Sequence, residues 1–388
     1  MAISEKNGQV PHLPKVFHKD QIQALGRKST QGMRWEPATI KDDLILKIKC
    51  VTAGYEELRK KLPYPCASTL QRIIQHITFE SGNLDEVFDM ILASIKNLTA
   101  EQLSHISYCT LAGDEMAVEP TQMVDPSTKK PIDHVTLNSH DGIANKALVF
   151  ILGGISSRWK QTLGYYFTRA KAGGEDADAV GREIAEIIME IIKRAEAIGL
   201  RVHRFTSDMG PENQAVWRHL GVRCNRFECI YSVDHPVRKG DQLCFVPDVL
   251  HLFKALKRTI VANGSVFLPD NIVEREGLPT NEVNASHIKA LLDEQDKMEL
   301  KIAQILKKDS LEPKRHFHDM KVGTARGVIS RRTATGLHVL ALTKQDPSYI
   351  TTAWFINHVN RWFELMTSRR HKLALRQNQR FTTKLSSI

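Results

Sequence analysis

Two apolar segments that each end in an aspartate constrain the fold of this chain more than any other feature. One segment ends at Asp114 in Leu111-Ala-Gly-Asp114, and another ends at Asp208 in Phe205-Thr-Ser-Asp208. Between them, residues 177–197 place apolar side chains along one stripe at helical spacing. Strands followed by alternating helices and strands are typical of a mixed sheet. We therefore predict an α/β fold, a mixed sheet with flanking helices.

The other elements of this sheet follow from short apolar runs separated by glycine-containing turns. Strands are predicted over residues 107–117, 134–137, 147–152, 161–168, 200–205 and 242–246, and helices over 212–220 and from Asp248 onward. Gly199 is a typical helix end, and Pro211 is a typical first helical residue.

Composition shifts divide the chain into five predicted regions. They are a polar leader (1–37), a helix-turn-helix-like region (38–100), the sheet domain (101–259), a helical region (260–370) and a basic tail (371–388). In the second region a Pro-bounded turn separates two short helices from a third, for which Ser68 and Gln71 predict a capping box. A plain helical subdomain is the alternative. In the fourth region, 287–306 and 348–366 have helical periodicity.

The charge balance favours a polyanionic partner. The 388 residues carry 54 Lys and Arg against 44 Asp and Glu, a net charge of +10. The apolar runs are too short to span a bilayer, so we expect no membrane partner. The basic tail is either a solvated segment or a nucleic-acid contact. Cys224, Cys229 and His235 suggest zinc, but the cysteine spacing is unusual, and buried thiols are the favoured alternative.

Carboxylates at strand ends can carry metal-dependent chemistry. In open α/β sheets functional groups gather at the carboxyl ends of strands, where Asp114 and Asp208 are expected. Two such acids can hold Mg²⁺ for phosphoryl transfer, although aspartates at these places also cap turns. Asp248, His251 and Lys254 share one helical face, which suggests either a polar face or a weaker metal site.

Four long motifs in a fixed order resemble the P-element transposase family, which includes the transposase-derived THAP-domain proteins. The motifs are Leu-Ala-Gly-Asp114-Glu-Met, Ser-Ser-Arg158-Trp159-Lys160-Gln161, Ser-Asp208-Met-Gly-Pro-Glu-Asn213-Gln214-Ala-Val-Trp217 and Pro247-Asp248-Val-Leu-His251-Leu-Phe-Lys254. Further along, Trp354 through Glu364 resembles the end of the family's GTP-binding insertion. The resemblance spans about residues 17–370.

This resemblance implies an RNase H-like catalytic domain, interrupted by a helical GTP-binding insertion, that cleaves and joins DNA strands with Mg²⁺. Asp114 and Asp208 match the first two catalytic acids and are the implied metal ligands. Glu364 matches an aspartate that reads the guanine base, and Asp296, with Asp293, lies where a second nucleotide-contacting aspartate is expected. GTP is thus the second implied cofactor. The implied partners are transposon-end DNA and further copies or sibling transposase subunits, in the nucleus.

Two parts of the family pattern are not found in this sequence. The N-terminal zinc module is missing, and the third catalytic acid, from an Asp-x-x-Glu helix, is expected about where this chain ends. The matches Asp296-Lys-Met-Glu299 and Asp309-Ser-Leu-Glu312 fall inside the insertion. We therefore expect a truncated transposase that lacks the third acid. The alternative is a catalytically inactive, domesticated derivative that binds DNA or regulates.

Overall fold

The chain contains two compact units, Met1–Glu80 and Ser81–Ile388. A computed structural model describes residues 17–75, 79–120, 124, 133–169, 177–225, 227–312 and 321–368. The predicted basic tail and residues 1–16 of the predicted leader therefore lie outside the described residues. Within the described ranges, no helix is both long and apolar enough to cross a membrane.

The described part of the first unit contains the helices α2 (Lys19–Leu25), α3 (Pro37–Arg59) and α4 (Ala67–Ile74). Its small core joins Ile40 and Tyr55 of α3 to Leu70 of α4. The Tyr55 hydroxyl donates to the carbonyl of Pro65 over 2.9 Å, which ties α3 to the segment before α4. Buried Asp20 of α2 accepts a 2.6 Å hydrogen bond from the Thr39 hydroxyl, so α2 is held against the start of α3.

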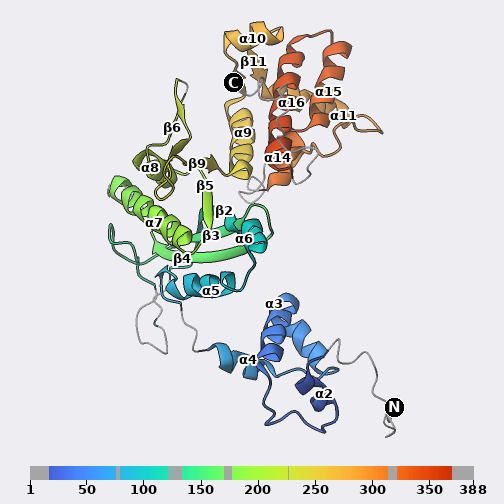
Figure 1. Ribbon diagram of the computed structural model, residues 1–388. Coiled ribbons are helices and arrows are strands. Elements are labelled where there is room, and N and C mark those ends of the chain that lie inside the picture. The colour runs from blue at the N-terminus through green and yellow to red at the C-terminus, as the bar shows by residue number, and fades with distance from the viewer. Residues whose placement is uncertain are drawn as a thin grey trace. The chain divides into compact units, whose positions relative to one another are not determined.

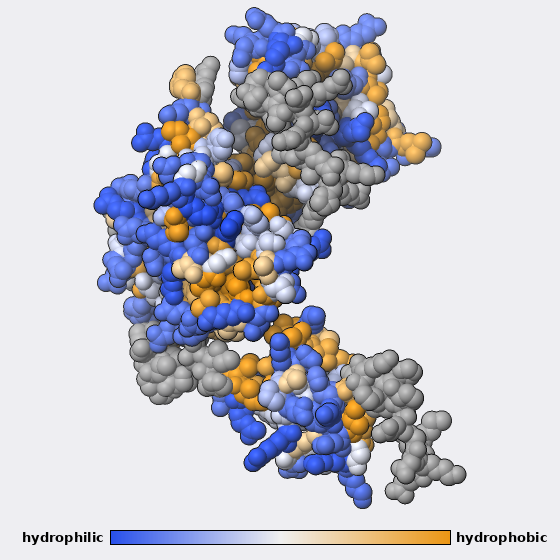
Figure 2. All heavy atoms as spheres, viewed as in Figure 1, coloured by the Kyte–Doolittle hydropathy of each residue, from blue (hydrophilic) through white to orange (hydrophobic). Residues whose placement is uncertain are grey.

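Apolar side chains also reach the surface of this unit, as Figure 2 shows by its orange areas. Ile48 is 78% exposed and Val51 is 69% exposed, both on α3. Val51 has a φ of 60°, which is strained for a β-branched residue, and the helix kinks there. Two helices were predicted in this stretch, and the non-helical backbone of Val51 divides α3 into two helical segments.

The second unit contains a seven-stranded mixed sheet in the order β1-β4-β3-β2-β5-β9-β8 (Figure 1). The strands are β1 (Gly82–Asn83), β2 (Tyr108–Ala117), β3 (Lys146–Gly154), β4 (Lys160–Thr168), β5 (Arg201–Ser207), β8 (Ser232–Asp234) and β9 (Gln242–Pro247). Strands β2, β3 and β4 form an antiparallel meander, whereas β5 pairs in parallel with β2 on one side and with β9 on the other. The predicted mixed sheet with flanking helices is confirmed.

Helices pack on this sheet through one apolar core. They are α5 (Asp85–Ile95), α6 (Ala100–Ser107), α7 (Ala177–Ala197) and α8 (Pro211–His219). The predicted stripe of α7 supplies Ile184, Ile188 and Ile191, which are buried with strand residues such as Leu111 and Phe205. Helix α7 also packs against α8, α5 contacts β4, and α6 runs directly into β2 (Figure 1).

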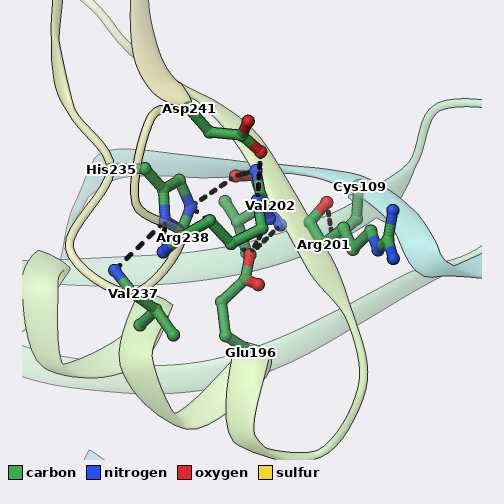
Figure 3. A network of polar contacts seen from close by, with 8 residues as sticks. All are labelled: Cys109, Glu196, Arg201, Val202, His235, Val237, Arg238 and Asp241. Atoms are coloured by element: carbon green, nitrogen blue, oxygen red, sulfur yellow. Dashed lines mark hydrogen bonds and ion pairs between the residues drawn. The ribbon is translucent and has the colours of Figure 1, made fainter.

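A buried polar network connects the end of α7, the start of β5 and the β8–β9 turn (Figure 3). The fully buried His235 side chain donates from Nε2 to the Val202 carbonyl over 3.0 Å, while its Nδ1 accepts from the backbone N–H groups of Val237 and Arg238. Arg238 pairs with Glu196, which also accepts a 2.7 Å hydrogen bond from the N–H of Val202. The network therefore fixes β9 and its turn beside β5.

The insertion domain follows β9 and has its own hydrophobic core. Its elements are α9 (Val249–Asn263), β10 (Ser265–Phe267), α10 (Asp270–Glu276), β11 (Glu282–Asn284), α11 (Ala285–Gln295), α12 (Lys308–Leu311), α14 (Val322–Val328), α15 (Arg331–Thr343) and α16 (Ser348–Met366). Helices α15 and α16 pack together, and α11 packs against both. Phe253 of α9 stacks on Phe363 of α16, with ring centroids 3.9 Å apart, so α9 is part of this core.

Some predicted elements differ in the structure. The helix expected over 287–306 ends at Gln295, because the buried Gln295 side chain accepts from the N–H of Ala303 and donates to the Leu306 carbonyl. The segment then folds back instead of continuing as a helix.

Two shorter predictions were also wrong. The strand expected over 134–137 is only an isolated bridge between His134 and Ile143. The capping box expected at Ser68 is not formed, because Cys66 is the N-cap of α4 and Ser68 lies in its first turn. Helix α2 lies in the region predicted to be a leader, where His18 and Gln21 form a capping box instead.

We expect the first unit to lose stability as the pH rises from about 4 to about 7. Burial, together with the charges of Asp20 and Asp42, raises the pKa of Asp43 from 3.8 to about 7. The folded unit then binds a proton that the unfolded chain releases, so stability falls across this window and levels off above it. Hydrogen exchange of the α3 amides, compared at each pH with that of the Asp43→Asn variant, measures the stability of the unit. An equal pH dependence in both proteins would contradict the prediction.

Candidate active site

Three neighbouring strands carry one aspartate each at one end of the sheet: Asp208 and Asp248 directly follow β5 and β9, and Asp114 lies within β2 just past the end of its parallel pairing with β5. Ala112 of β2 lies opposite Thr206 of β5, so Asp114 and Asp208 both come two residues further along. On the other side, Ser207 lies opposite Pro247, and the N–H of Asp248 donates to the Ser207 carbonyl over 2.8 Å. The pairing register therefore brings Asp114 and Asp208 to one sheet edge and adds Asp248 beside them.

The turn after β5 holds Asp208 in a defined position. Its Oδ1 accepts hydrogen bonds from the Asn213 side chain at 2.6 Å and from the N–H of Gly210 at 3.0 Å. Gly210 is the N-cap of α8 and Pro211 is the first helical residue, so the chain turns sharply after the strand. Among the described residues, the hydrogen bonds from Asn213 and Gly210 to this carboxylate both reach Oδ1.

Asp248 is the N-cap of α9 and pairs with a histidine one turn later. Its Oδ1 accepts from the N–H of Leu250 at 2.7 Å, and its Oδ2 lies 2.8 Å from His251 Nδ1. Partial burial raises the pKa of Asp248, but the hydrogen bonds from His251 and from the helix N–H groups outweigh it, so the pKa is below its usual value. Asp248 is therefore ionised near neutral pH.

The charges at this edge act on Asp114 from several sides. Partial burial of its carboxyl is the largest cause that raises the pKa of Asp114, and the carboxylates of Asp208 and Asp248 raise it further. The N–H of Glu115 and the His251 ring lower it, without cancelling the rise. Asp114 thus lies in a field of like charge that a bound cation would relieve.

The donor set at the edge suits a hard divalent cation, which prefers carboxylate oxygens. No three His, Cys, Asp or Glu side chains within the described ranges converge closely enough to hold a metal ion as they stand. The structure therefore brings together the predicted pair, Asp114 and Asp208, without a ready-made third ligand.

A lysine supports the same edge from within the sheet. Lys146 of β3 pairs with Glu115 of β2 at 2.7 Å and with Glu212 of α8 at 3.2 Å. Glu115 directly follows Asp114, so this bridge joins the end of β2 to the helix that follows Asp208. This bridge could not be predicted from the sequence, because its three members are far apart in the chain and form no local pattern.

The two residues predicted to contact a nucleotide lie apart in the insertion domain. Asp296 is the C-cap of α11, is exposed and pairs with Lys301 at 2.5 Å. Glu294, two residues earlier, pairs with Lys344 just before α16 begins. Glu364 is exposed near the other end of α16, about 24 Å along that helix at 1.5 Å per residue. The structure does not bring Asp296 and Glu364 together.

Comparison with known proteins identifies both domains of the second unit. Residues 79–221 match the family model of the TNP-like RNase H N-terminal domain, and residues 271–377 match that of the TNP-like GTP-binding insertion domain. Together these models cover more than half of the chain. The chain belongs to the P-element transposase family.

Individual members of this family align along nearly the whole chain. The Drosophila melanogaster transposable element P transposase is 25% identical over 92% of this chain and 42% of its own length. The human DNA transposase THAP9 is 21% identical over 90% of this chain and 38% of its own length. The chain therefore spans about two fifths of the length of these two curated relatives.

The fold also matches a solved structure. The Drosophila P element transposase strand transfer complex superimposes with a TM-score of 0.72 and 22% sequence identity, over 92% of this chain and 72% of that chain. This match, with the family model for residues 79–221, identifies the mixed sheet as an RNase H-like domain.

We expect the Asp114→Asn variant to be more stable than the wild-type chain at neutral pH in the presence of a chelator. The raised pKa of Asp114 means that its ionised form is disfavoured in the folded state, so removing the charge relieves repulsion. Below the pKa of the unfolded carboxyl the advantage should vanish. Urea unfolding of both proteins, at neutral pH and at a pH below the pKa of the unfolded carboxyl, measures the difference in the free energy of unfolding. A variant less stable than the wild-type chain at neutral pH would contradict the prediction.

Proposed function

We propose that this chain acts on DNA as a P-element-type transposase, with Asp114 and Asp208 as Mg²⁺ ligands for strand cleavage and transfer. The observation that carries the proposal is the register of β2 and β5, which places both carboxylates at one edge of an RNase H-like sheet. The net charge of +10 supports a polyanionic partner.

The residues at the edge fit a magnesium ion. Each aspartate uses Oδ1 for a local backbone bond, to Glu115 N–H for Asp114 and to Gly210 N–H for Asp208. These bonds orient both carboxylates and leave their second oxygens for a cation. When bound, the ion would neutralise charge on the phosphate and activate the attacking oxygen. Lys146 would keep the two supporting elements together during the reaction.

The two Asp-x-x-Glu matches of this sequence lie away from Asp114 and Asp208. Both Asp-x-x-Glu matches belong to the insertion domain, where Asp296 caps α11 and Asp309 lies in α12. Neither is part of the strand edge that holds Asp114 and Asp208. The competing function is therefore a catalytically inactive derivative that binds DNA, alone or with further copies or sibling transposase subunits. Either activity would be carried out in the nucleus.

Catalysis by Asp114 and Asp208 predicts that the full chain nicks supercoiled plasmid DNA in Mg²⁺, and that Asp114→Asn or Asp208→Asn reduces the rate by about 100-fold or more. A metal ligand at such a site contributes several kcal/mol of transition-state stabilisation. Asp241→Asn is the matched control, because Asp241 pairs with Arg238 in the network beside β5, and it should retain activity. Gel electrophoresis of the plasmid forms measures the rate.

The outcome separates the two functions. Nicking that the Asp114→Asn variant abolishes would exclude the inactive derivative. DNA binding without nicking in the wild-type chain would instead establish the derivative and contradict catalysis by this chain.

We also propose that the insertion domain binds GTP and that Glu364 contacts the guanine base. The family model for residues 271–377 supports this function, and Glu364 is exposed near the end of α16. A carboxylate can accept two N–H groups at once, which matches the edge of guanine and not that of adenine. Because Asp296 lies at the opposite end of α16, we assign it no contact with the same base.

We expect the Glu364→Gln variant to lose about 10-fold or more of the preference for GTP over ATP, because an amide offers only one acceptor oxygen to the base. Asp296→Asn is the control and should keep the preference. Calorimetric titration with each nucleotide measures both affinities. Equal affinity of the wild-type chain for GTP and ATP would contradict the proposed guanine contact. A loss of the GTP preference in Asp296→Asn alone would indicate that the nucleotide binds near α11.

A further inference from the structure

Two cysteines face each other in a small hairpin of the RNase H-like domain. Strands β6 (Arg223–Cys224) and β7 (Cys229–Ile230) follow α8 and precede β8, and Figure 1 shows the hairpin projecting from the domain. Cys224 and Cys229 are directly opposite each other in this antiparallel pair. Both are free thiols, and their sulfur atoms lie 2.9 Å apart.

The hairpin register places these cysteines at a non-hydrogen-bonded pair, the type of antiparallel pair with the shorter Cα–Cα distance. The N–H of Asn225 donates to the Glu228 carbonyl over 2.8 Å, so that pair is hydrogen-bonded. Antiparallel pairs alternate, and the next pair, Cys224 with Cys229, is therefore the non-hydrogen-bonded type, whose Cα atoms are about 4.5 Å apart. This separation falls within the range of about 4.4–6.8 Å that a disulfide spans.

Exposure makes both thiols reachable from solvent. Cys224 and Cys229 are exposed, whereas Cys109 in β2 is buried and its pKa is raised by burial to about 12. The sequence analysis favoured buried thiols at 224 and 229, and this was wrong, because the hairpin projects from the domain instead of packing into its core.

The zinc alternative is not supported by the described residues. His235, the expected third ligand, is buried, and both of its ring nitrogens are used in backbone hydrogen bonds (Figure 3). No group of three metal-binding side chains forms within the ranges that the structure describes. The two sulfurs therefore have each other as the nearest reaction partners.

We propose that Cys224 and Cys229 form a reversible disulfide that closes the β6–β7 hairpin, with a small disulfide such as oxidised glutathione as the oxidant. One cysteine thiolate attacks a sulfur of oxidised glutathione, which forms a mixed disulfide and releases one glutathione thiolate. The second cysteine thiolate then attacks the protein sulfur of that mixed disulfide and releases the other. The two cysteines are oxidised by two electrons, their two protons end on the released glutathiones, and oxidised glutathione is reduced.

The environment of the pair determines when the reaction proceeds. Partial desolvation and the hydrogen bond to Cys229 raise the pKa of Cys224 to about 11, so Cys224 is mostly a thiol at neutral pH. Oxidation should therefore speed up as the pH rises. An exposed disulfide is also readily reduced again, which makes the bond responsive to the redox state of its surroundings.

A disulfide between Cys224 and Cys229 would constrain the segment of the chain that connects Asp208 to Asp248. The hairpin lies in the chain between α8, which follows Asp208, and β9, which leads to Asp248. Phe227 at its turn is 92% exposed. A covalent bond across the strands fixes their register and therefore the position of this turn. The proposed disulfide does not depend on whether the domain cleaves DNA.

The experiment is a thiol analysis of the intact full-length chain. The protein is incubated with oxidised and reduced glutathione at pH 8, free thiols are blocked with N-ethylmaleimide, and peptides are mapped by mass spectrometry. We expect a linked peptide pair that contains Cys224 and Cys229 and has lost two hydrogens, and recovery of both thiols after dithiothreitol. The Cys229→Ser variant should instead carry one glutathione on Cys224.

Two controls distinguish the pair from general cysteine reactivity. Cys66 is the natural comparison, because hydrogen bonds from Ser68 and Thr69 lower its pKa to about 7, and it should form a glutathione adduct. Circular dichroism of the reduced Cys229→Ser chain verifies its fold. The proposal is overturned if both hairpin thiols end as glutathione adducts, if they link to other chains, or if one equivalent of Zn²⁺ protects both from N-ethylmaleimide.

Discussion

The parallel pairing of β5 with β2 and β9 is the constraint on which the candidate site depends. Because Ala112 lies opposite Thr206, Asp114 and Asp208, each two residues further along, reach the same level of the sheet. A slip of one residue would turn Asp114 to the other face of the sheet and separate the pair. The buried network of Glu196, His235 and Arg238 holds the opposite ends of β5 and β9 in place, so the register is fixed far from the site that uses it.

Much of this arrangement could be predicted from the sequence, because the elements concerned carry strong local signals. The helix predicted over 177–197 and the one predicted over 348–366 have these bounds in the structure, since their apolar residues recur at helical spacing. The prediction of Asp114 and Asp208 as a pair started from the local sequence around each aspartate. An apolar strand that ends in an aspartate predicts an edge position, and two such strands in parallel place both acids at the same edge.

Elements that depend on contacts between distant residues could not be predicted in this way. The periodicity over 287–306 continues past Gln295, but the helix stops there because that side chain binds the backbone of a later turn. Cys66 caps α4 without a side-chain hydrogen bond, which no capping pattern would indicate. For Asp248 the sequence predicted only a polar helical face or a weaker metal site, since its place beside Asp208 follows from the pairing of β9 with β5.

Helix α9 links the strand edge to the insertion domain. Its N-cap, Asp248, lies at the edge, and Phe253, little more than one turn later, is buried in the insertion core. There Phe253 stacks on Phe363, which also has the Arg326 guanidinium 5.7 Å from its ring centroid. A closely packed contact transmits displacement because its rings cannot move independently. Since Glu364 directly follows Phe363, this ring contact joins the end of α16 that carries Glu364 to the helix whose N-cap is Asp248.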